Sequence, residues 1–101
     1  MTSTMQNGGI VLMTVANDIN LLDAEAGDSF KVIVRDISET VSIRPDSGDT
    51  IVFPGISPVL DASDELDSPG GAQDELVCQC ITAGTWYCNG TPGWTDGGAG
   101  D

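Results

Sequence analysis

Hydrophobic and polar residues alternate along several short stretches of this chain, and such alternation predicts β-strands. The clearest stretch is residues 29–36, SFKVIVRD, where Phe30, Val32 and Val34 fall on one face and a mixed set of residues falls on the other. A strand with one uniformly apolar face buries that face and leaves the other partly in solvent. We therefore expect this segment to lie in a sheet with one side against the core.

Turn sequences rich in Gly, Pro, Asn and Asp separate the remaining apolar stretches. Further strands are expected at residues 10–16, 40–45, 50–55, 59–60, 75–82 and 85–89, with a last strand or cap at 93–95. The pattern contains no alternation of strands with helices, which excludes a parallel α/β fold. About seven short strands at this spacing predict an all-β fold, either a small, jelly-roll-like β-sandwich or a β-barrel.

The chain has 101 residues, which is the size of one domain. Its first nine residues are polar and uncharged and end in Gly-Gly, so we expect residues 1–9 to form an extended N-terminal arm. The single β domain is then expected over residues 10–96, followed by a flexible, glycine-rich tail at 97–101. Within the domain, residues 57–75 have the loosest pattern and are expected to hold a long acidic loop.

The charge of the chain limits the classes of partner that it can bind, because it has sixteen acidic residues and only three basic ones. A net charge of −13 repels phosphate, so we expect neither direct nucleic-acid binding nor binding to a membrane surface. The sequence shows neither a signal peptide nor an apolar run long enough to span a membrane. Histidine is absent, which removes the commonest general base and metal ligand. No enzymatic activity and no cofactor are expected.

Three cysteines, Cys78, Cys80 and Cys88, leave three readings open. They are buried reduced thiols, or two of them form a disulfide, or they bind a metal with a further ligand. A two-residue turn at Ala83–Gly84 would place Gln79 opposite Cys88, whereas a three-residue loop would place Cys80 there. Only the second register permits a Cys80–Cys88 disulfide.

Four acidic residues cluster in residues 61–67, DASDELD. Their spacing does not match an EF-hand loop, so a solvated loop is favoured over a weak calcium site. The tripeptide Asn89–Thr91 matches a glycosylation acceptor, but Asn-Gly is better explained as a turn. We expect no metal site in the domain.

The aromatic residues near the C-terminal end raise the question of a sugar-binding platform. Trp86 and Tyr87 are adjacent in a predicted strand, so their side chains point to opposite faces and do not form one flat surface. Trp86 is therefore expected to anchor the core or a subunit interface. Trp94 follows two turns and is the aromatic residue expected to be exposed.

Three segments together suggest a family: residues 26–34, AGDSFKVIV; residues 41–51, VSIRPDSGDTI; and residues 74–95, DELVCQCITAGTWYCNGTPGWT. Their order resembles that of small virion proteins encoded by tailed bacteriophages. The resemblance extends from about Gly27 to Thr95 and is most specific between Cys80 and Trp94. Because these residues are mostly turn and packing types, the resemblance indicates the fold more than an activity. The acidity of residues 61–75 departs from the family pattern.

The resemblance implies a capsid decoration, or cement, protein. Such proteins are made in the host cytoplasm and lie on the outer capsid surface of the virion. There they bind the major capsid protein and brace neighbouring capsomers, often as trimers. A homo-oligomer, with a trimer favoured, and a contact surface containing Met5, Ile10, Trp86 and Trp94 are therefore expected. The alternatives are a tail-fibre or tip domain that recognises host glycans and a minor head–tail structural protein.

Overall fold

β-Strands dominate the protein, as the computed structural model shows for residues 3–14, 18–35, 40–56, 59–61, 64–70 and 73–97. The all-β prediction is confirmed. In this part of the chain one helical turn is joined by nine strands: α1 (Ser3–Gln6), β1 (Asn7–Met13), β2 (Asp18–Asn20), β3 (Ser29–Val34), β4 (Ser42–Arg44), β5 (Thr50–Val52), β6 (Leu66–Asp67), β7 (Glu75–Thr82), β8 (Thr85–Gly90) and β9 (Thr95–Asp96).

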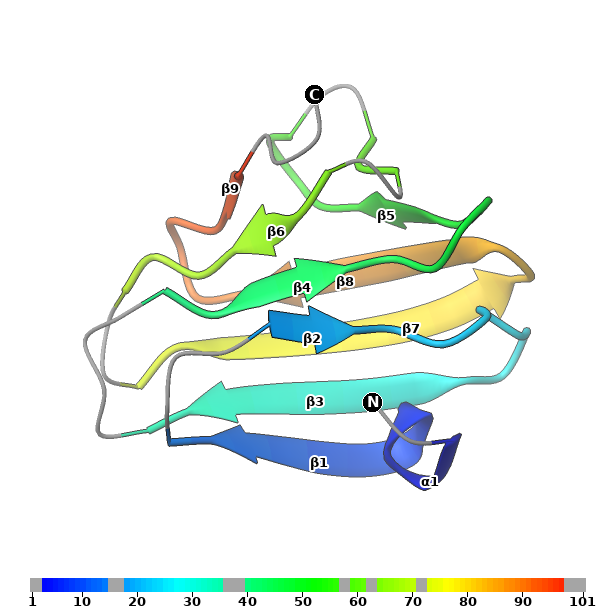
Figure 1. Ribbon diagram of the computed structural model, residues 1–101, viewed down its shortest axis with the longest axis horizontal. Helices are drawn as coiled ribbons and strands as arrows, with labels where there is room; N and C mark the ends of the chain where they lie inside the picture. The colour runs from blue at the N-terminus through cyan, green and yellow to red at the C-terminus, as the bar shows by residue number, and fades with distance from the viewer. Residues whose placement is uncertain are drawn as a thin grey trace.

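The strands form two sheets that lie one in front of the other (Figure 1). The larger sheet has the order β1-β3-β7-β8-β5, and the smaller has the order β2-β4-β6-β9. Three of the pairings are parallel: β1 with β3, β2 with β4, and β5 with β8. The architecture is thus a mixed β-sandwich, which differs from a regular jelly roll, because the strands of a jelly roll are antiparallel.

One hydrophobic core lies between the two sheets and includes the inward residues of both. In β3 the alternation predicted from the sequence is present, since Phe30, Val32 and Val34 are all buried. The smaller sheet contributes Ile43 and Leu66, each fully buried. Apolar burial contributes about 25 cal/mol per Å² of surface removed from water, so this shared layer is the main stabilising contribution in a chain of this size.

A β-bulge near Ile81 sets the register of the β7–β8 hairpin. The turn is the predicted two-residue Ala83–Gly84, with Gly84 at φ +87°, yet Cys78 and not Gln79 lies opposite Cys88. The extra residue in β7 shifts the pairing by one position. Both registers considered from the sequence are therefore wrong, because neither of them included a bulge in β7.

The N-terminal segment is not a free arm in its described part, which corrects the prediction for residues 1–9. Residues 3–6 form α1, and β1 begins at Asn7, three residues before the predicted strand. The buried Gln6 side chain holds α1 in place: its Nε2 donates to the carbonyl oxygens of Leu22 and Asp23, at 3.1 and 3.0 Å, and its Oε1 accepts from Leu22 N–H. Residues 1–2, and residues 15 and 16 of the predicted first strand, lie outside the described residues.

The predicted acidic loop also needs correction, because part of it belongs to the smaller sheet. Leu66 pairs with Ile43 and is fully buried, and the hydroxyl of Ser68 accepts the backbone N–H of Val41 at 2.8 Å. An apolar residue and a hydroxyl therefore hold part of this acidic stretch against the core. At the predicted tail, Gly97 N–H donates to the carbonyl of Glu65 at 2.8 Å, and residues 98–101 lie outside the described residues.

Replacing Trp86 tests the position of the core. Trp86 is fully buried and its ring meets Phe30 edge-on, with centroids 5.0 Å apart. We expect Trp86→Ala to lower the free energy of unfolding by about 3–5 kcal/mol, the usual cost of removing a large buried aromatic side chain. The neighbouring Tyr87→Ala should cost no more than about 1 kcal/mol, because that side chain is exposed. Urea unfolding followed by circular dichroism measures both; equal losses would contradict the assigned faces of β8.

Candidate functional site

The four residues expected at a partner surface divide into two exposed and two buried ones. Met5 on α1 and Ile10 on β1 are 38% and 64% exposed. Trp86 is fully buried and Trp94 is only 4% exposed, so neither indole reaches the surface of the domain. The prediction that Trp94 is an exposed contact is therefore wrong, and of the two roles expected for Trp86 the structure shows the core one.

Trp94 is buried because it closes the end of the β7–β8 hairpin. Its indole Nε1 donates to the carbonyl oxygen of Glu75 at 3.1 Å, and Thr91 N–H donates to the same oxygen at 3.0 Å. The ring lies against Gly90, where a Cβ would meet both this carbonyl and the indole nitrogen. Gly90 thus provides the space for Trp94, and this dependence was not visible in the sequence because it rests on a contact with Glu75, 19 residues away in the chain.

The larger sheet presents a largely apolar surface to solvent, which we call the outer face. It is formed by Ile10, Leu12, Ile33, Val77 and Tyr87, with the charged pair Lys31 and Glu75 and the polar Gln79 and Asn89 among them. Strand pairing places these side chains on one side, since Ile10, Lys31 and Val77 lie in one row and Leu12, Ile33 and Glu75 in the next. Leu12 is 55% exposed, Val77 42% and Tyr87 43%. An apolar patch shared by several strands is typical of a binding surface.

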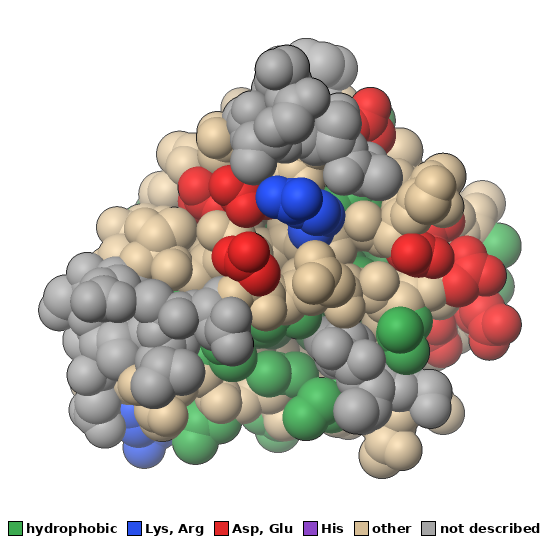
Figure 2. Space-filling view, in the orientation of Figure 1, with side chains coloured by type: hydrophobic (Ala, Val, Ile, Leu, Met, Phe, Trp, Pro, Cys, Tyr) green, Lys and Arg blue, Asp and Glu red, His purple; other side chains and the backbone are tan. Residues whose placement is uncertain are grey.

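Charge on the outer face is balanced, in contrast to the rest of the acidic chain. Lys31 Nζ lies 2.9 Å from Glu75 Oε1, and the two side chains are partly exposed. Such an exposed pair contributes at most about 1 kcal/mol to stability, but it leaves the face without net charge. The opposite side of the molecule has acidic side chains left of centre, in the centre and on the right, with a basic group between them, and hydrophobic side chains along its lower part, where β1 and β3 run (Figure 2).

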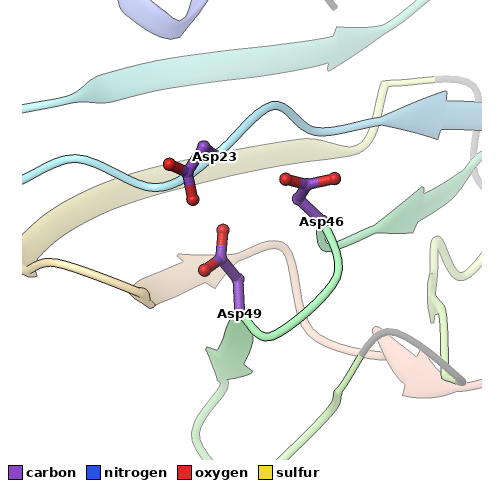
Figure 3. A group of neighbouring side chains, drawn as sticks. All are labelled: Asp23, Asp46 and Asp49. Atoms are coloured by element: carbon purple, nitrogen blue, oxygen red, sulfur yellow. The ribbon is translucent and has the colours of Figure 1, made fainter.

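An acidic cluster forms where three carboxylates from distant positions meet. Asp23 follows β2, and Asp46 and Asp49 bound the tight turn between β4 and β5; the three side chains point toward one another (Figure 3). One oxygen from each lies within 4.8 Å of the others. Oxygen ligands at such separations suit a hard divalent cation such as Ca²⁺. The turn at Asp46–Asp49 was predicted, but its approach to Asp23 depends on packing between distant segments.

Hydrogen bonds to buried groups hold this acidic cluster in place. Asp49 is buried, and its Oδ2 accepts the backbone N–H of Ala24 at 2.8 Å. The adjacent pocket, of about 260 Å³, is lined by Gln6, Asn7, Leu22, Asp23, Glu25 and Asp28. Asp49 therefore has a structural role as the acceptor for Ala24, whatever the cluster binds.

The acidic residues singled out in the sequence, residues 61–67, are arranged differently. The Asp64 carboxylate accepts the N–H of Asp61 at 3.0 Å, so it stabilises a local turn. Asp64 is buried, although a solvated loop was predicted here. Among the described residues, the carboxylates that come together are those of Asp23, Asp46 and Asp49.

The three cysteines are buried free thiols. Cys78 faces Cys88 across the hairpin, and burial, reinforced by the neighbouring Cys88 thiol, raises the pKa of Cys78 well above its ordinary value. Burial also raises the pKa of Cys80. Cys80 lies opposite Trp86, so the Cys80–Cys88 disulfide considered from the sequence is not formed. Of the three readings, the structure shows reduced cysteines in the core.

Comparison with known proteins identifies no relative: the chain matches no family model, no curated protein and no solved structure. In the described part of the chain, no helix has the length and apolar character needed to cross a membrane.

Thiol reactivity tests the burial of the cysteines. Since the thiolate is the reactive form and burial raises the pKa of Cys78 and Cys80, we expect slow modification of the folded protein by Ellman's reagent at pH 8. In urea all three thiols should react at once. Spectrophotometric titration under both conditions measures this, and three rapidly reacting thiols in the folded protein would contradict the assignment.

Removing the Asp49 carboxylate tests its structural role. Asp49→Ala leaves the buried Ala24 N–H without its acceptor, and we expect a loss of about 1–3 kcal/mol in the free energy of unfolding. Asp46→Ala removes an exposed carboxylate of the same cluster and serves as the matched control, with a change below about 0.5 kcal/mol. Unfolding curves in urea with EDTA present would refute the assignment if the two variants were equally stable.

Proposed function

We propose that this chain is a structural virion protein without enzymatic activity, a capsid decoration protein that binds the outer surface of the major capsid protein shell. The single observation that carries this proposal is the outer face, an apolar surface that a soluble acidic protein leaves exposed. The resemblance of residues 27–95 to small virion proteins of tailed bacteriophages directs the proposal to the capsid. The chain's charge of −13 suits the outside of a shell better than its DNA-facing side.

Binding through the outer face would use rigid elements, because the side chains that make the contact stand on paired strands. Val77 and Tyr87 lie on the two strands of the β7–β8 hairpin, whose opposite side is packed into the core. A rigid apolar surface loses little conformational entropy on binding. Bound across the junction of two capsomers, it adds buried area to contacts that internal pressure would otherwise open. Repetition over many symmetric copies multiplies a modest contact into a large effect.

Ile10 remains a candidate contact residue in this arrangement, because it is exposed on the outer face. Met5 is exposed too, but it packs on the other side of β1, against Gly9, and is therefore not part of the outer face. Trp86 and Trp94 do not contact a partner in this arrangement, since both are buried. Their burial also takes away the indoles on which glycan recognition by a tail-fibre domain would rest. A minor head–tail protein differs from a decoration protein in copy number, so quantifying the protein in purified virions separates these two possibilities.

The cementing role is tested with virions of the encoding phage that carry or lack this protein. We expect particles without it to release DNA at lower temperature or after milder osmotic shock, because contacts between capsomers lose their bracing. Added purified protein should restore resistance. Particles that are equally robust with and without the protein would refute the role.

Two variants locate the contact in the same assay. Val77→Asp adds a negative charge at the centre of the outer face, where the neighbouring Lys31 is already paired with Glu75. We expect binding of this variant to depleted particles to weaken by about tenfold or more, the effect of burying a charge that has no partner of its own. Asn20→Asp adds the same charge on β2 of the other sheet and serves as the control. Equal binding by the two variants would show that the outer face is not the contact.

A further inference from the structure

β1 is an edge strand that is regular from Gly9 to Met13 and has a single irregularity near its start, between Asn7 and Gly9. It forms the end of the larger sheet, and no strand in the described part of the chain pairs with its outer side (Figure 1). Its seven residues, Asn7–Met13, include neither a charged residue nor a proline. Edge strands of soluble proteins are normally guarded by charges, prolines or covering segments, because free backbone groups pair with other chains.

The direction of the backbone groups in β1 follows from one hydrogen bond. Met13 accepts the N–H of Arg35 through its carbonyl, so the backbone groups of Met13 point toward β3. Successive residues of a strand point their N–H and C=O groups to opposite sides. Val11 therefore also faces β3, and the N–H and C=O groups of Ile10 and Leu12 point away from the sheet. The same two residues carry large exposed apolar side chains.

We propose that two copies of this chain pair antiparallel through β1, about a two-fold axis at Val11, and join their larger sheets into one continuous sheet. With Val11 opposite Val11 of the partner, Ile10 of each copy lies opposite Leu12 of the other. The outward backbone groups of these two residues are then placed to exchange N–H···O=C hydrogen bonds. The axis is perpendicular to the sheet, so both outer faces lie on the same side of the dimer. Ile10 and Leu12 of both copies form one apolar group at its centre.

Charge favours a second copy as the occupant of this edge. Two chains with a net charge of −13 repel each other over most of their surfaces, whereas β1 is uncharged. Its two ends differ in charge. Asp23, Glu25 and Asp28 line the pocket beside Asn7 at the first end, whereas at the other end the exposed Arg35 lines a pocket with Glu75. Antiparallel pairing brings Arg35 of each copy toward the acidic end of its partner.

Sedimentation of the full chain measures the proposed dimer. In the micromolar range we expect a species of twice the 10.4 kDa chain mass. Added salt should strengthen the dimer, because the repulsion between two chains of charge −13 outweighs the local attraction at Arg35, and screening reduces that repulsion. Hydrogen exchange provides a local readout, since the amides of Ile10 and Leu12 should become protected as concentration rises. A monomer at all accessible concentrations, or the trimer that the family resemblance implies, would overturn the proposal.

Ile10→Pro is the main variant, because proline removes the backbone N–H of residue 10. This N–H points away from β3, so the pairing of β1 with β3 is preserved. One donor disappears from each copy, and we expect the dissociation constant to rise roughly 10- to 100-fold. Leu12→Asp, which places a charge beside the axis, should dissociate the dimer even if the proline variant folds poorly. Circular dichroism confirms that each variant is folded. Dimers of unchanged affinity in folded Ile10→Pro and Leu12→Asp would overturn the proposal.

Val77→Asp separates this inference from the proposed function. The substitution lies on the outer face two strands away from the edge, so its dimer should have the affinity of the unmodified protein. Equal weakening of the dimer by Val77→Asp and Leu12→Asp would mean that the two copies meet through the outer face, which overturns pairing through β1. The dimer is measured on purified protein, so it can be found or excluded whatever the binding to capsids shows.

Discussion

The rest of the fold depends on the register of the β7–β8 hairpin, which the bulge near Ile81 determines. Without the extra residue, Trp86 and Cys88 would lie opposite Ile81 and Gln79, and the two strands would present their apolar residues to opposite sides of the sheet. The bulge realigns them, so that Cys78, Cys80, Trp86 and Cys88 all enter the core. Ile81 is 69% exposed, and this exposure is the cost of the realignment.

The remaining elements are placed against this hairpin by a few buried polar contacts. β3 pairs with β7, and β5 with β8, which extends the sheet on both sides. The Gln6 side chain hydrogen-bonds to the backbone of Leu22, and Asp49 accepts the N–H of Ala24. The segment from Leu22 to Ala24 is therefore fixed at both of its ends. In a chain with few aromatic residues, such directed contacts specify connections that apolar packing alone would leave degenerate.

Local patterns in the sequence predicted well where the strands lie, but they predicted poorly which strands pair with one another. The alternation of Phe30, Val32 and Val34 identified β3 and its buried face, and the turn at Ala83–Gly84 was placed correctly. The parallel pairings join strands far apart in the chain, so no local pattern encodes them. The burial of Trp94 rests on Gly90 and the carbonyl of Glu75, and the acidic cluster on the approach of Asp23 to a distant turn. The sequence showed that β3 has a mixed face with Lys31 and Ile33. That this face continues through Val77 and Tyr87 could be seen only once the strand order was known.

The strand order also bears on how the protein folds. Apart from the hairpin of β7 and β8, every pairing in the larger sheet joins strands that are not consecutive in the sequence. β3 can pair early with β1, but its second neighbour β7 and the β8 partner of β5 exist only after residues 75–90 have been synthesised. Folding that depends on such late, distant partners is slow compared with that of chains rich in local contacts. During that interval β1, with its uncharged apolar edge, is held by β3 alone, and the excess of negative charge elsewhere in the chain keeps nascent copies apart.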